Sequence, residues 1–347
     1  MLEHGGRLQQ ASQRYGLPRE RWLDLSTGIN PIGWQATAAA VSVGSWNRLP
    51  EEEDGLMEAA EAYYGAPTIL PVSGSQAAIQ TLPRLRSRSR VGVPKLGYNE
   101  HAHRWAQAGH DVVPLAVADF EAALGGLDVL VASNPNNPTG ERFAPDQLLD
   151  WHARLHSRGG WLVIDEAFID STPECSVARF TDREGLIVLR SLGKFFGLAG
   201  ARVGFVLASR ELLRSLAEWL GPWALAGPSR VVAKASLLDQ AWQKSTRQRL
   251  RQDGRRLAVL LASHGLKPAG GCDLFQWVSV PNALEVHEAL ARQGILTRYF
   301  ATAPSVRFGL PAKAEDWGRL ETALSISRDV QEIAENARDE AKREARS

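Results

Sequence analysis

Short apolar runs alternate with longer segments of helical periodicity through the middle of the chain, and this alternation constrains the fold more than any other feature of the sequence. Most of the runs are uniformly apolar, which is typical of strands covered on both faces. The pattern predicts an α/β fold in which crossover helices join a mostly parallel sheet. The expected strands are Arg90–Val93, Asp128–Ala132, Trp161–Ile164, Leu186–Leu189 and Val203–Leu207.

Segments with apolar residues at helical spacing lie between these runs. The expected helices among them are Leu56–Tyr64, Gln76–Leu85, Ala102–Gln107 and Pro145–Ser157. One longer helix is expected over Val231–Ser263 because no proline interrupts that stretch, although Gly254 lowers its helix propensity.

The pattern changes after residues 270–271, a Gly-Gly step. A strand is expected over residues 273–280, an amphipathic helix over 283–294 and a further strand over 305–310, which together predict a smaller α+β domain. We therefore expect a large domain over residues 45–230 and a small domain made of 1–44 and 231–347. The charged, alanine-rich end of the chain, residues 328–347, is expected to be a solvated helix or a partner-binding tail.

Composition excludes several classes of protein. The 347 residues carry 40 basic and 39 acidic side chains, a formal net charge of +1, which argues against a strongly basic nucleic-acid-binding protein. Cys175 and Cys272 are far apart and form no metal-ligand spacing, so we expect neither a disulfide framework nor a metal site. No stretch approaches the roughly 18 apolar residues of a membrane helix, and the N-terminus lacks the apolar run of a signal peptide. A soluble, cytoplasmic protein is expected.

Polar motifs lie where expected strands end or helices begin, which is where open α/β sheets bind ligands. The first is the SGSQ sequence at residues 73–76, whose small residues would let backbone N–H groups approach a phosphate; the alternative is an ordinary helix cap. The second, residues 134–140, contains two Asn–Pro steps. Such a rigid loop could hold an asparagine amide in a fixed position or could be a plain turn.

Two further motifs carry charges. Asp165 ends the apolar run 161–164, and a buried carboxylate is costly unless a cation or hydrogen-bond donors meet it, so we expect it to have a function rather than only to cap a helix. Lys194 lies among glycines and aromatic residues just after the strand 186–189, with Arg202 farther along the same loop. A desolvated lysine of this kind is suited to forming a Schiff base, and the arginine could share an anion. A surface lysine in a flexible loop is the alternative.

In this order, a phosphate loop, an asparagine, an aspartate, a lysine and an arginine resemble the signature of fold-type I pyridoxal-phosphate enzymes of the aspartate-aminotransferase superfamily, over nearly the whole chain. The sequence is most similar to the histidinol-phosphate-aminotransferase-like branch. Within that branch, residues 4–6 (HGG), 24–31 (DLSTGINP) and 221–225 (GPWAL) resemble the cobalamin-pathway L-threonine-O-3-phosphate decarboxylases. The resemblance implies a fold-type I fold, with a large cofactor-binding domain and a smaller α+β domain, and pyridoxal phosphate as the cofactor.

The resemblance also implies a role for each matching residue. Lys194 would bind pyridoxal phosphate as a Schiff base and, once substrate displaces it, would donate or accept a proton. Asp165 would pair with the pyridinium nitrogen, and Asn137 would donate to the phenolate oxygen. The remaining cofactor contacts would come from Gly74, Ser75, Gln76, Ser191 and Arg202 at the phosphate and from Tyr98, which would stack on the ring or only pack its loop.

The reaction implied is decarboxylation of L-threonine O-3-phosphate to (R)-1-amino-2-propanol O-2-phosphate and CO2 in cobalamin biosynthesis. The bond that breaks at the substrate Cα must stand perpendicular to the conjugated plane, so a decarboxylase must turn the carboxylate out of that plane. Arg307 matches the family's substrate-anion arginine, and the other expected substrate-binding residues are His4, Gly28, Asn137 and Arg298. Which cation meets the carboxylate and which meets the phosphate stays open. Arg298 could instead be a surface residue, and His4 part of a disordered terminus.

The sequence departs from the wider aminotransferase pattern at two positions. Phe168 stands where many aminotransferases have a tyrosine that donates to the cofactor's phenolate oxygen, so one donor is missing. Leu49 stands where relatives often have a tyrosine that reaches the neighbouring subunit's cofactor phosphate. The cysteine-rich C-terminal extension of some of the decarboxylases is not matched either.

Other functions remain open. An aminotransferase acting on histidinol phosphate or a related phosphorylated amine would share the phosphate-binding residues and would differ in releasing a 2-oxo product instead of CO2. A pyridoxal-phosphate-sensing regulator would need an added DNA-binding domain, for which the chain leaves no room. A nicotinamide-dependent dehydrogenase is disfavoured because residues 72–76 do not supply G-x-G-x-x-G after a strand. By analogy with the family, a homodimer is expected.

Overall fold

The computed structural model describes residues 4–326, so the end of the chain expected to form a charged helix, 328–347, lies outside the described residues. The chain divides into two compact units. Unit 1 contains the described residues up to Pro31 and from Arg251 onward, and unit 2 is Ile32–Leu250. The division therefore differs from the expected boundaries at 44/45 and 230/231. The segments in question belong to unit 2 because α9 (Gly227–Leu238) packs against α2 (Gly44–Asn47) and α3 (Leu56–Tyr64).

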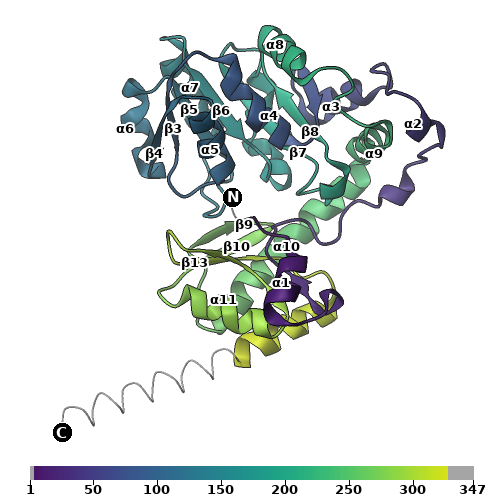
Figure 1. Cartoon of the computed structure of the whole chain (residues 1–347), viewed down its shortest axis with the longest axis vertical. Coiled ribbons are helices and arrows are strands. Elements are labelled where there is room, and N and C mark those ends of the chain that lie inside the picture. The colour runs from purple at the N-terminus through teal and green to yellow at the C-terminus, as the bar shows by residue number, and fades with distance from the viewer. Residues whose placement is uncertain (1–3, 327–347) are drawn as a thin grey trace. The chain divides into compact units, whose positions relative to one another are not determined.

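A seven-stranded sheet forms the centre of unit 2, in the order β2-β8-β7-β6-β5-β3-β4 (Figure 1). Its strands are β2 (Ile69–Val72), β3 (Arg90–Pro94), β4 (Asp111–Leu115), β5 (Val129–Ser133), β6 (Trp161–Asp165), β7 (Leu186–Ser191) and β8 (Gly204–Leu207). Only β8 runs antiparallel to its neighbours, so the expected mostly parallel sheet is confirmed. The sequence pattern missed β2 and β4, the two edge strands, because each contains a proline, a residue that sheets tolerate at their edges.

Successive residues along each strand of this sheet point to opposite faces, and both faces are covered. Val129 and Val131 of β5 lie in a buried cluster with α4 (Ser75–Thr81), α5 (Asn99–Gln107) and α8 (Arg210–Leu220). Leu130 and Ala132, which alternate with them, are buried as well. Each fully buried valine or leucine contributes roughly 1.5–3 kcal/mol. The sheet therefore forms a rigid centre that fixes the positions of its strand ends.

Other helices of unit 2 pack around this centre. The ring of Tyr64 in α3 packs against that of Phe205 in β8, with centroids 5.4 Å apart, and α7 (Pro145–His156) packs against β6. The short α6 (Phe120–Ala123) precedes β5. The expected helix Gln76–Leu85 divides into α4 and a 3-10 turn, Leu82–Leu85, because Pro83 has no N–H to continue the α-helix.

The prediction of a single helix over Val231–Ser263 is wrong. The structure has α9 and then α10 (Gln240–Ser263), separated at Asp239. The Asp239 carboxylate accepts hydrogen bonds from the Trp242 backbone N–H and from the Trp34 indole N–H, both at 3.0 Å. A polar cap rather than a proline therefore breaks the helix. Gly254 stays within α10, where a Cβ would lie 3.1 Å from the Cα of Asp273.

Unit 1 contains a four-stranded antiparallel sheet in the order β12-β13-β10-β9. Its strands are β9 (Gly270–Cys272), β10 (Phe275–Ser279), β12 (Arg298–Phe300) and β13 (Ser305–Gly309). The unit also contains a parallel pair, β1 (Leu23–Asp24) and β11 (Ile295–Leu296), and the helices α1 (Leu8–Tyr15) and α11 (Ala283–Arg292). The end of α10, from Arg251 onward, and a helix over residues 314–326 belong to the same unit. The expected strand–helix–strand pattern of the small domain is confirmed.

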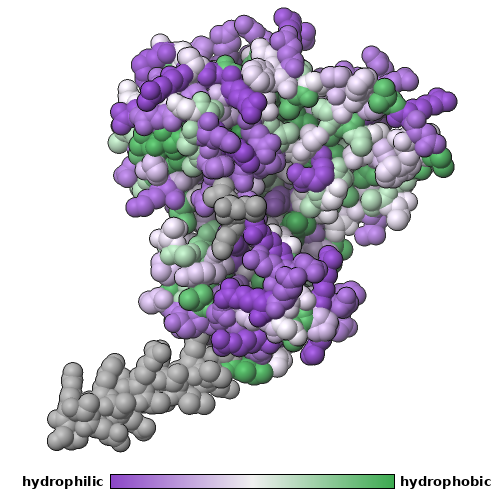
Figure 2. All heavy atoms as spheres, viewed as in Figure 1, coloured by the Kyte–Doolittle hydropathy of each residue, from purple (hydrophilic) through white to green (hydrophobic). Residues whose placement is uncertain are grey.

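The described surface is mostly polar, with apolar side chains exposed around α2. Val43 and Trp46 are 74% and 71% exposed, and Leu49 is exposed beside them. Figure 2 shows green, hydrophobic atoms at the place of α2. Between residues 4 and 326, no helix is long and apolar enough to cross a membrane. Within the same range, no group of three or more His, Cys, Asp or Glu side chains could hold a metal ion.

Candidate active site

A cavity of about 150 Å³ lies in unit 2 where β5, β6 and β7 end and α4 begins; we call it the strand-end cavity. All nine residues expected to bind a cofactor line it: Gly74, Ser75, Gln76, Tyr98, Asn137, Asp165, Ser191, Lys194 and Arg202. The parallel sheet brings them together because consecutive parallel strands end at one edge, so residues far apart in sequence meet there.

Asp165 is the last residue of β6, and its carboxylate is held from two sides. The Ala167 backbone N–H donates to Oδ1 at 3.0 Å, and His101 Nε2 lies 3.0 Å from Oδ2. Since a carboxylate accepts and does not donate, the His101 N–H is the donor. Each carboxylate oxygen has a further lone pair that can accept an N–H from a ligand in the cavity. The sequence analysis missed His101, although it follows Tyr98 by three positions in the same helical turn.

Tyr98 is fixed by a chain of hydrogen bonds. Its hydroxyl donates to Gln76 Oε1 at 3.1 Å, and Gln76 Nε2 donates to Glu100 Oε2 at 2.8 Å. Glu100 is buried and also pairs with Arg104 at 3.1 Å. Burial, together with the charges of Glu100 and Asp165, raises the pKa of Tyr98 to about 12, so its hydroxyl stays a donor at neutral pH. The side chain of Gln76 is therefore turned towards Tyr98 and Glu100, which leaves its backbone N–H as the group suited to a phosphate.

The first turn of α4 and the Arg202 side chain form a cradle that suits an anion. Gly74 adopts φ 73°, and a Cβ there would lie 2.6 Å from an Arg202 guanidinium nitrogen, so only glycine leaves this space open. Arg202 itself adopts the left-handed conformation, with φ 54°. The first backbone N–H groups of a helix have no partner within the helix and can bind an anion. The cradle fits a phosphate group, with Ser191 lining the same cavity.

Lys194 and Asn137 come from two loops that bound the cavity. Lys194 Nζ lies 5.3 Å from the centroid of the buried Phe168 ring, a residue that offers no hydrogen-bond donor. Asn137 belongs to the rigid loop after β5, in which the Asn134–Pro135 and Asn137–Pro138 bonds are both cis. Asn134 anchors this loop, because its amide accepts from the Phe143 backbone N–H at 3.1 Å and donates to the Phe143 carbonyl at 3.3 Å.

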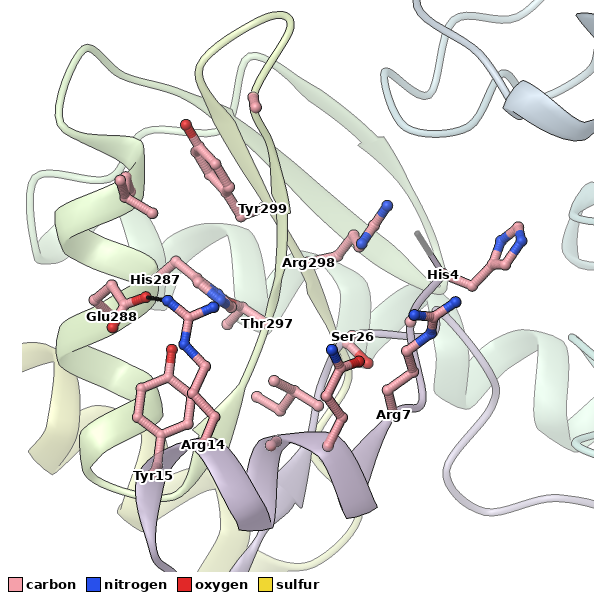
Figure 3. A pocket seen from close by; sticks show the side chains of 16 residues that line it. His4, Arg7, Arg14, Tyr15, Ser26, His287, Glu288, Thr297, Arg298 and Tyr299 are labelled. Atoms are coloured by element: carbon pink, nitrogen blue, oxygen red, sulfur yellow. Dashed lines mark hydrogen bonds and ion pairs between the residues drawn. The ribbon is translucent and has the colours of Figure 1, made fainter. Parts of the chain in front are cut away.

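A second cavity, of about 320 Å³, lies within unit 1, and we call it the cationic cavity (Figure 3). Expected substrate residues His4 and Arg298 line it, together with Arg7 and Arg14. Arg14 donates to the carboxylate of Glu288 at 2.6 Å. The sequence analysis did not single out Arg7, because nothing in the local pattern distinguishes it from the other arginines of the chain.

Arg307 and Gly28, also expected at the substrate, line neither cavity. Arg307 is buried on β13 directly opposite Arg298 on β12, and its guanidinium donates to the Ser26 carbonyl at 2.7 Å. Burial, and the neighbouring charge of Arg298, lower the pKa of Arg307 to about 10. Gly28, with φ 63°, lies two residues after Ser26 in the same segment.

Residues 21–336 match the family model described as aminotransferase class I and II. The chain belongs to that family. A threonine-phosphate decarboxylase from Pseudomonas aeruginosa is 55% identical over 324 residues, which cover 93% of this chain and 97% of that protein. A threonine-phosphate decarboxylase from Sinorhizobium sp is 44% identical over 331 residues, which cover 93% and 98%. The expected superfamily is confirmed.

Solved structures of aminotransferases confirm the fold. The structure of histidinol-phosphate aminotransferase from Sinorhizobium meliloti in complex with pyridoxal-5'-phosphate has a TM-score of 0.82 to this chain, at 20% identity, and covers 95% of this chain and 99% of that one. The fold-type I architecture therefore holds for this member of the aminotransferase class I and II family.

This member of the aminotransferase class I and II family also has a buried ion cluster that the sequence analysis missed. Arg190, fully buried, pairs with Glu166 at 2.9 Å and with Asp170, and lies over the Tyr64 ring. Burial raises the pKa of Glu166, and Arg190 only partly offsets this. The cluster joins the loop after Asp165 to the strand that leads to Lys194, so it ties together two segments that line the strand-end cavity.

Proposed function

We propose that this chain is a pyridoxal-phosphate-dependent decarboxylase that converts L-threonine O-3-phosphate to (R)-1-amino-2-propanol O-2-phosphate and CO2, in cobalamin biosynthesis. The observation that carries the proposal is the identity of 55% and 44%, over more than nine-tenths of this chain, to proteins named threonine-phosphate decarboxylase. The phosphate cradle and the cationic cavity support a phosphorylated cofactor and a phosphorylated substrate.

The residues of the strand-end cavity fit pyridoxal phosphate. Arg202, Ser191 and the first turn of α4 would hold its phosphate, and Tyr98 would stack on its ring. Asp165, oriented by His101, would accept the N–H of the ring nitrogen and keep that nitrogen protonated. When bound, the cofactor supplies a conjugated ring that accepts the electron pair of the bond broken at the substrate Cα.

Lys194 would act twice. Its Nζ would hold the cofactor covalently until the substrate amine replaces it. The released amine would then give a proton to the substrate Cα after CO2 has left, so that hydrogen replaces the carboxylate in the product. Asn137 would be the one side-chain donor to the cofactor's phenolate oxygen, because Phe168 lacks a hydroxyl.

Unit 1 would supply the cations for the substrate. His4 and Arg298, which line the cationic cavity, are suited to the phosphate, while the buried Arg307 is the second guanidinium for the remaining anionic group. Gly28 keeps the segment after Ser26 in a left-handed turn.

The deciding experiment loads the protein with pyridoxal phosphate, adds L-threonine O-3-phosphate and measures released CO2 together with the absorbance of the cofactor. We expect CO2 to form over many turnovers while the cofactor absorbance returns to its starting spectrum. Conversion of the cofactor to pyridoxamine phosphate without CO2 would instead make the protein an aminotransferase. Histidinol phosphate serves as the comparison substrate and is expected to give no 2-oxo product.

We also propose a cytoplasmic homodimer. The exposed apolar side chains around α2, including Val43 and Trp46, support a surface covered by a second copy of the chain. Light scattering after size exclusion is expected to give twice the monomer mass, and Trp46→Glu is expected to lower it towards the monomer. A wild-type protein of monomer mass would contradict the proposal, and cell fractionation tests the compartment.

A further inference from the structure

A chain of side-chain hydrogen bonds joins the first turns of two helices that border the strand-end cavity. These helices, α4 and α5, pack against each other (Figure 1). Gln76 lies in the first turn of α4, Tyr98 directly precedes α5, and Glu100 lies in the first turn of α5. Gln76 and Tyr98 line the cavity, whereas Glu100 is buried and does not line it. The chain therefore connects a buried carboxylate to two residues of the cavity wall.

This chain can run in one direction only. Arg104 Nε donates to Glu100 Oε2 at 3.1 Å, and a guanidinium has no acceptor, so Glu100 is the accepting partner. Gln76 Nε2 donates to the same oxygen at 2.8 Å. A reversed Gln76 amide would set its oxygen against the carboxylate, with two acceptors facing each other. Gln76 Oε1 therefore faces Tyr98, whose hydroxyl donates to it at 3.1 Å. Glu100 thus decides which way the Gln76 amide points and where the Tyr98 proton goes.

The direction of the chain fixes the Tyr98 ring and its proton together. The ring meets the His101 ring edge to face, with centroids 6.1 Å apart and an interplanar angle of 82°, while Gln76 holds the hydroxyl. Because the hydroxyl hydrogen is directed to Gln76, the hydroxyl can offer the cavity only the lone pairs of its oxygen. A phosphate in the cradle at the start of α4 would receive no hydrogen bond from it. With the amide reversed, this proton could instead donate to such a phosphate, and the ring would tilt towards the cradle.

We propose that Glu100 is a positioning residue that, by orienting the Gln76 amide, holds the Tyr98 ring where it would stack on the cofactor; this rests on the function proposed above. Members of a buried hydrogen-bonded network depend on one another, so the loss of one changes the others. Glu100 acts only through Gln76 and the Tyr98 hydroxyl. Once that hydroxyl is removed, the carboxylate has no means of acting on the ring.

The test measures the Kd for pyridoxal phosphate by titrating the full chain, freed of cofactor, and following the absorbance of the bound cofactor. Glu100→Gln keeps the size of the side chain but can both donate and accept, so either orientation of the Gln76 amide becomes possible. We expect this variant to raise the Kd by about five-fold, the effect of losing one hydrogen bond of the network. At saturating cofactor, the circular dichroism of the bound cofactor at visible wavelengths, which depends on how its ring is held, is also expected to change.

Three comparisons separate this role from a general effect on the fold. Glu58→Gln is the matched control, because Glu58 also lies in the first turn of a helix, α3, but is exposed and does not line the cavity; it is expected to change the Kd by less than about two-fold. In a protein that already carries Tyr98→Phe, which keeps the ring and removes the hydroxyl, Glu100→Gln is expected to raise the Kd no further. Gln76→Met breaks the chain without altering Glu100 and is expected to match Glu100→Gln.

The outcomes distinguish this role from the proposed reaction. An unchanged Kd in Glu100→Gln, or losses that add up in the double variant, would overturn the role of Glu100. If the wild type releases no CO2 but the variants show the expected pattern of Kd values, the proposed reaction fails and the role of Glu100 stands. Catalytic release of CO2 with an unchanged Kd in Glu100→Gln would have the reverse meaning, and a protein that binds no pyridoxal phosphate would contradict both.

Discussion

The strand-end cavity and the cationic cavity are built in different ways. In the first, Asp165, Ser191 and the cradle at Gly74 lie at or beside the ends of strands whose side chains are buried in the sheet. In the second, the arginines come from the segment just before α1, from α1 itself and from a three-residue strand, β12, and Glu288 comes from α11. The two cavities thus differ in what holds their residues in place. The sheet fixes the groups that we propose to meet the cofactor, whereas shorter segments supply the charges that we propose to bind the substrate.

The largest effect is expected at the lysine of the strand-end cavity. Lys194→Ala removes both the covalent attachment and the proton donor, so we expect decarboxylation to fall by at least about 10⁴-fold. Lys234→Ala is the matched control, since Lys234 lies in the same unit but donates to the Asp54 carbonyl at 2.7 Å and does not line the cavity. CO2 release and the absorbance of the bound cofactor are the measurements. Turnover retained in Lys194→Ala would remove the strand-end cavity from the reaction.

The next effect concerns the stability of the loops that line that cavity. Arg190→Met leaves the buried carboxylates of Glu166 and Asp170 without their cation, which is expected to lower the free energy of unfolding by about 3–5 kcal/mol. Without Arg190, burial raises the pKa of Glu166 further and favours its protonated form, so the loss should be smaller in mildly acidic buffer than at neutral pH. Urea denaturation at both pH values measures it. Adding Glu166→Gln to Arg190→Met removes one buried charge and should restore part of the stability; no recovery would show that the ion cluster is not the cause.

The strand-end cavity could be predicted largely from the sequence. Asp165 directly follows an uninterrupted apolar run, and Ser191 and Lys194 lie at and just after the end of another. The order of strands along the chain then implies that their ends meet at one edge. The contacts between these residues could not be predicted in the same way. His101 meets Asp165 across 64 positions, and Gln76 turns its side chain to Tyr98, because tertiary packing and not local pattern decides both.

Fewer of the residues that line the cationic cavity could be predicted from the sequence, again because tertiary packing and not local pattern brings them together. Arg298 and His4 were expected from short motifs, but the pairing of β12 with β13, which sets Arg298 opposite Arg307, follows from a register that sequence periodicity does not define. The break at Asp239 shows a similar limit. A carboxylate that caps α10 can interrupt a helix as effectively as a proline, and aspartate is a preferred N-cap residue, a signal that the sequence analysis did not use.

A smaller effect is expected in the cationic cavity, where one substitution should make the protein more stable and its binding of substrate weaker. Arg298→Gln removes one of two facing guanidiniums, so we expect the free energy of unfolding to rise by about 0.2–1 kcal/mol. The same change should raise KM for L-threonine O-3-phosphate by about ten-fold, because the phosphate loses a charged partner. Denaturation and steady-state kinetics on one preparation measure both. A variant that loses stability as well as affinity would mean that Arg298 supports the fold, as Arg190 does, and the contrast between the two cavities would weaken.

The smallest effect is expected at Tyr98 in the strand-end cavity, where the change in stability depends on pH. Tyr98→Phe removes the hydroxyl that donates to Gln76 at 3.1 Å, which is expected to cost about 0.5–1.5 kcal/mol of stability at neutral pH. The pKa of Tyr98 is raised from 10.0 to about 12, so the folded protein holds this proton more tightly than the unfolded chain. This contribution is fully present below pH 10 and is lost as the pH rises towards about 12, so the advantage of wild type over Tyr98→Phe should shrink over that interval. Urea denaturation of both proteins at pH 8 and pH 11 gives the difference directly, and the other buried tyrosines cancel because both proteins contain them. A difference that stays constant with pH would mean that the phenol is not buried against Glu100 and Asp165 as the structure has it.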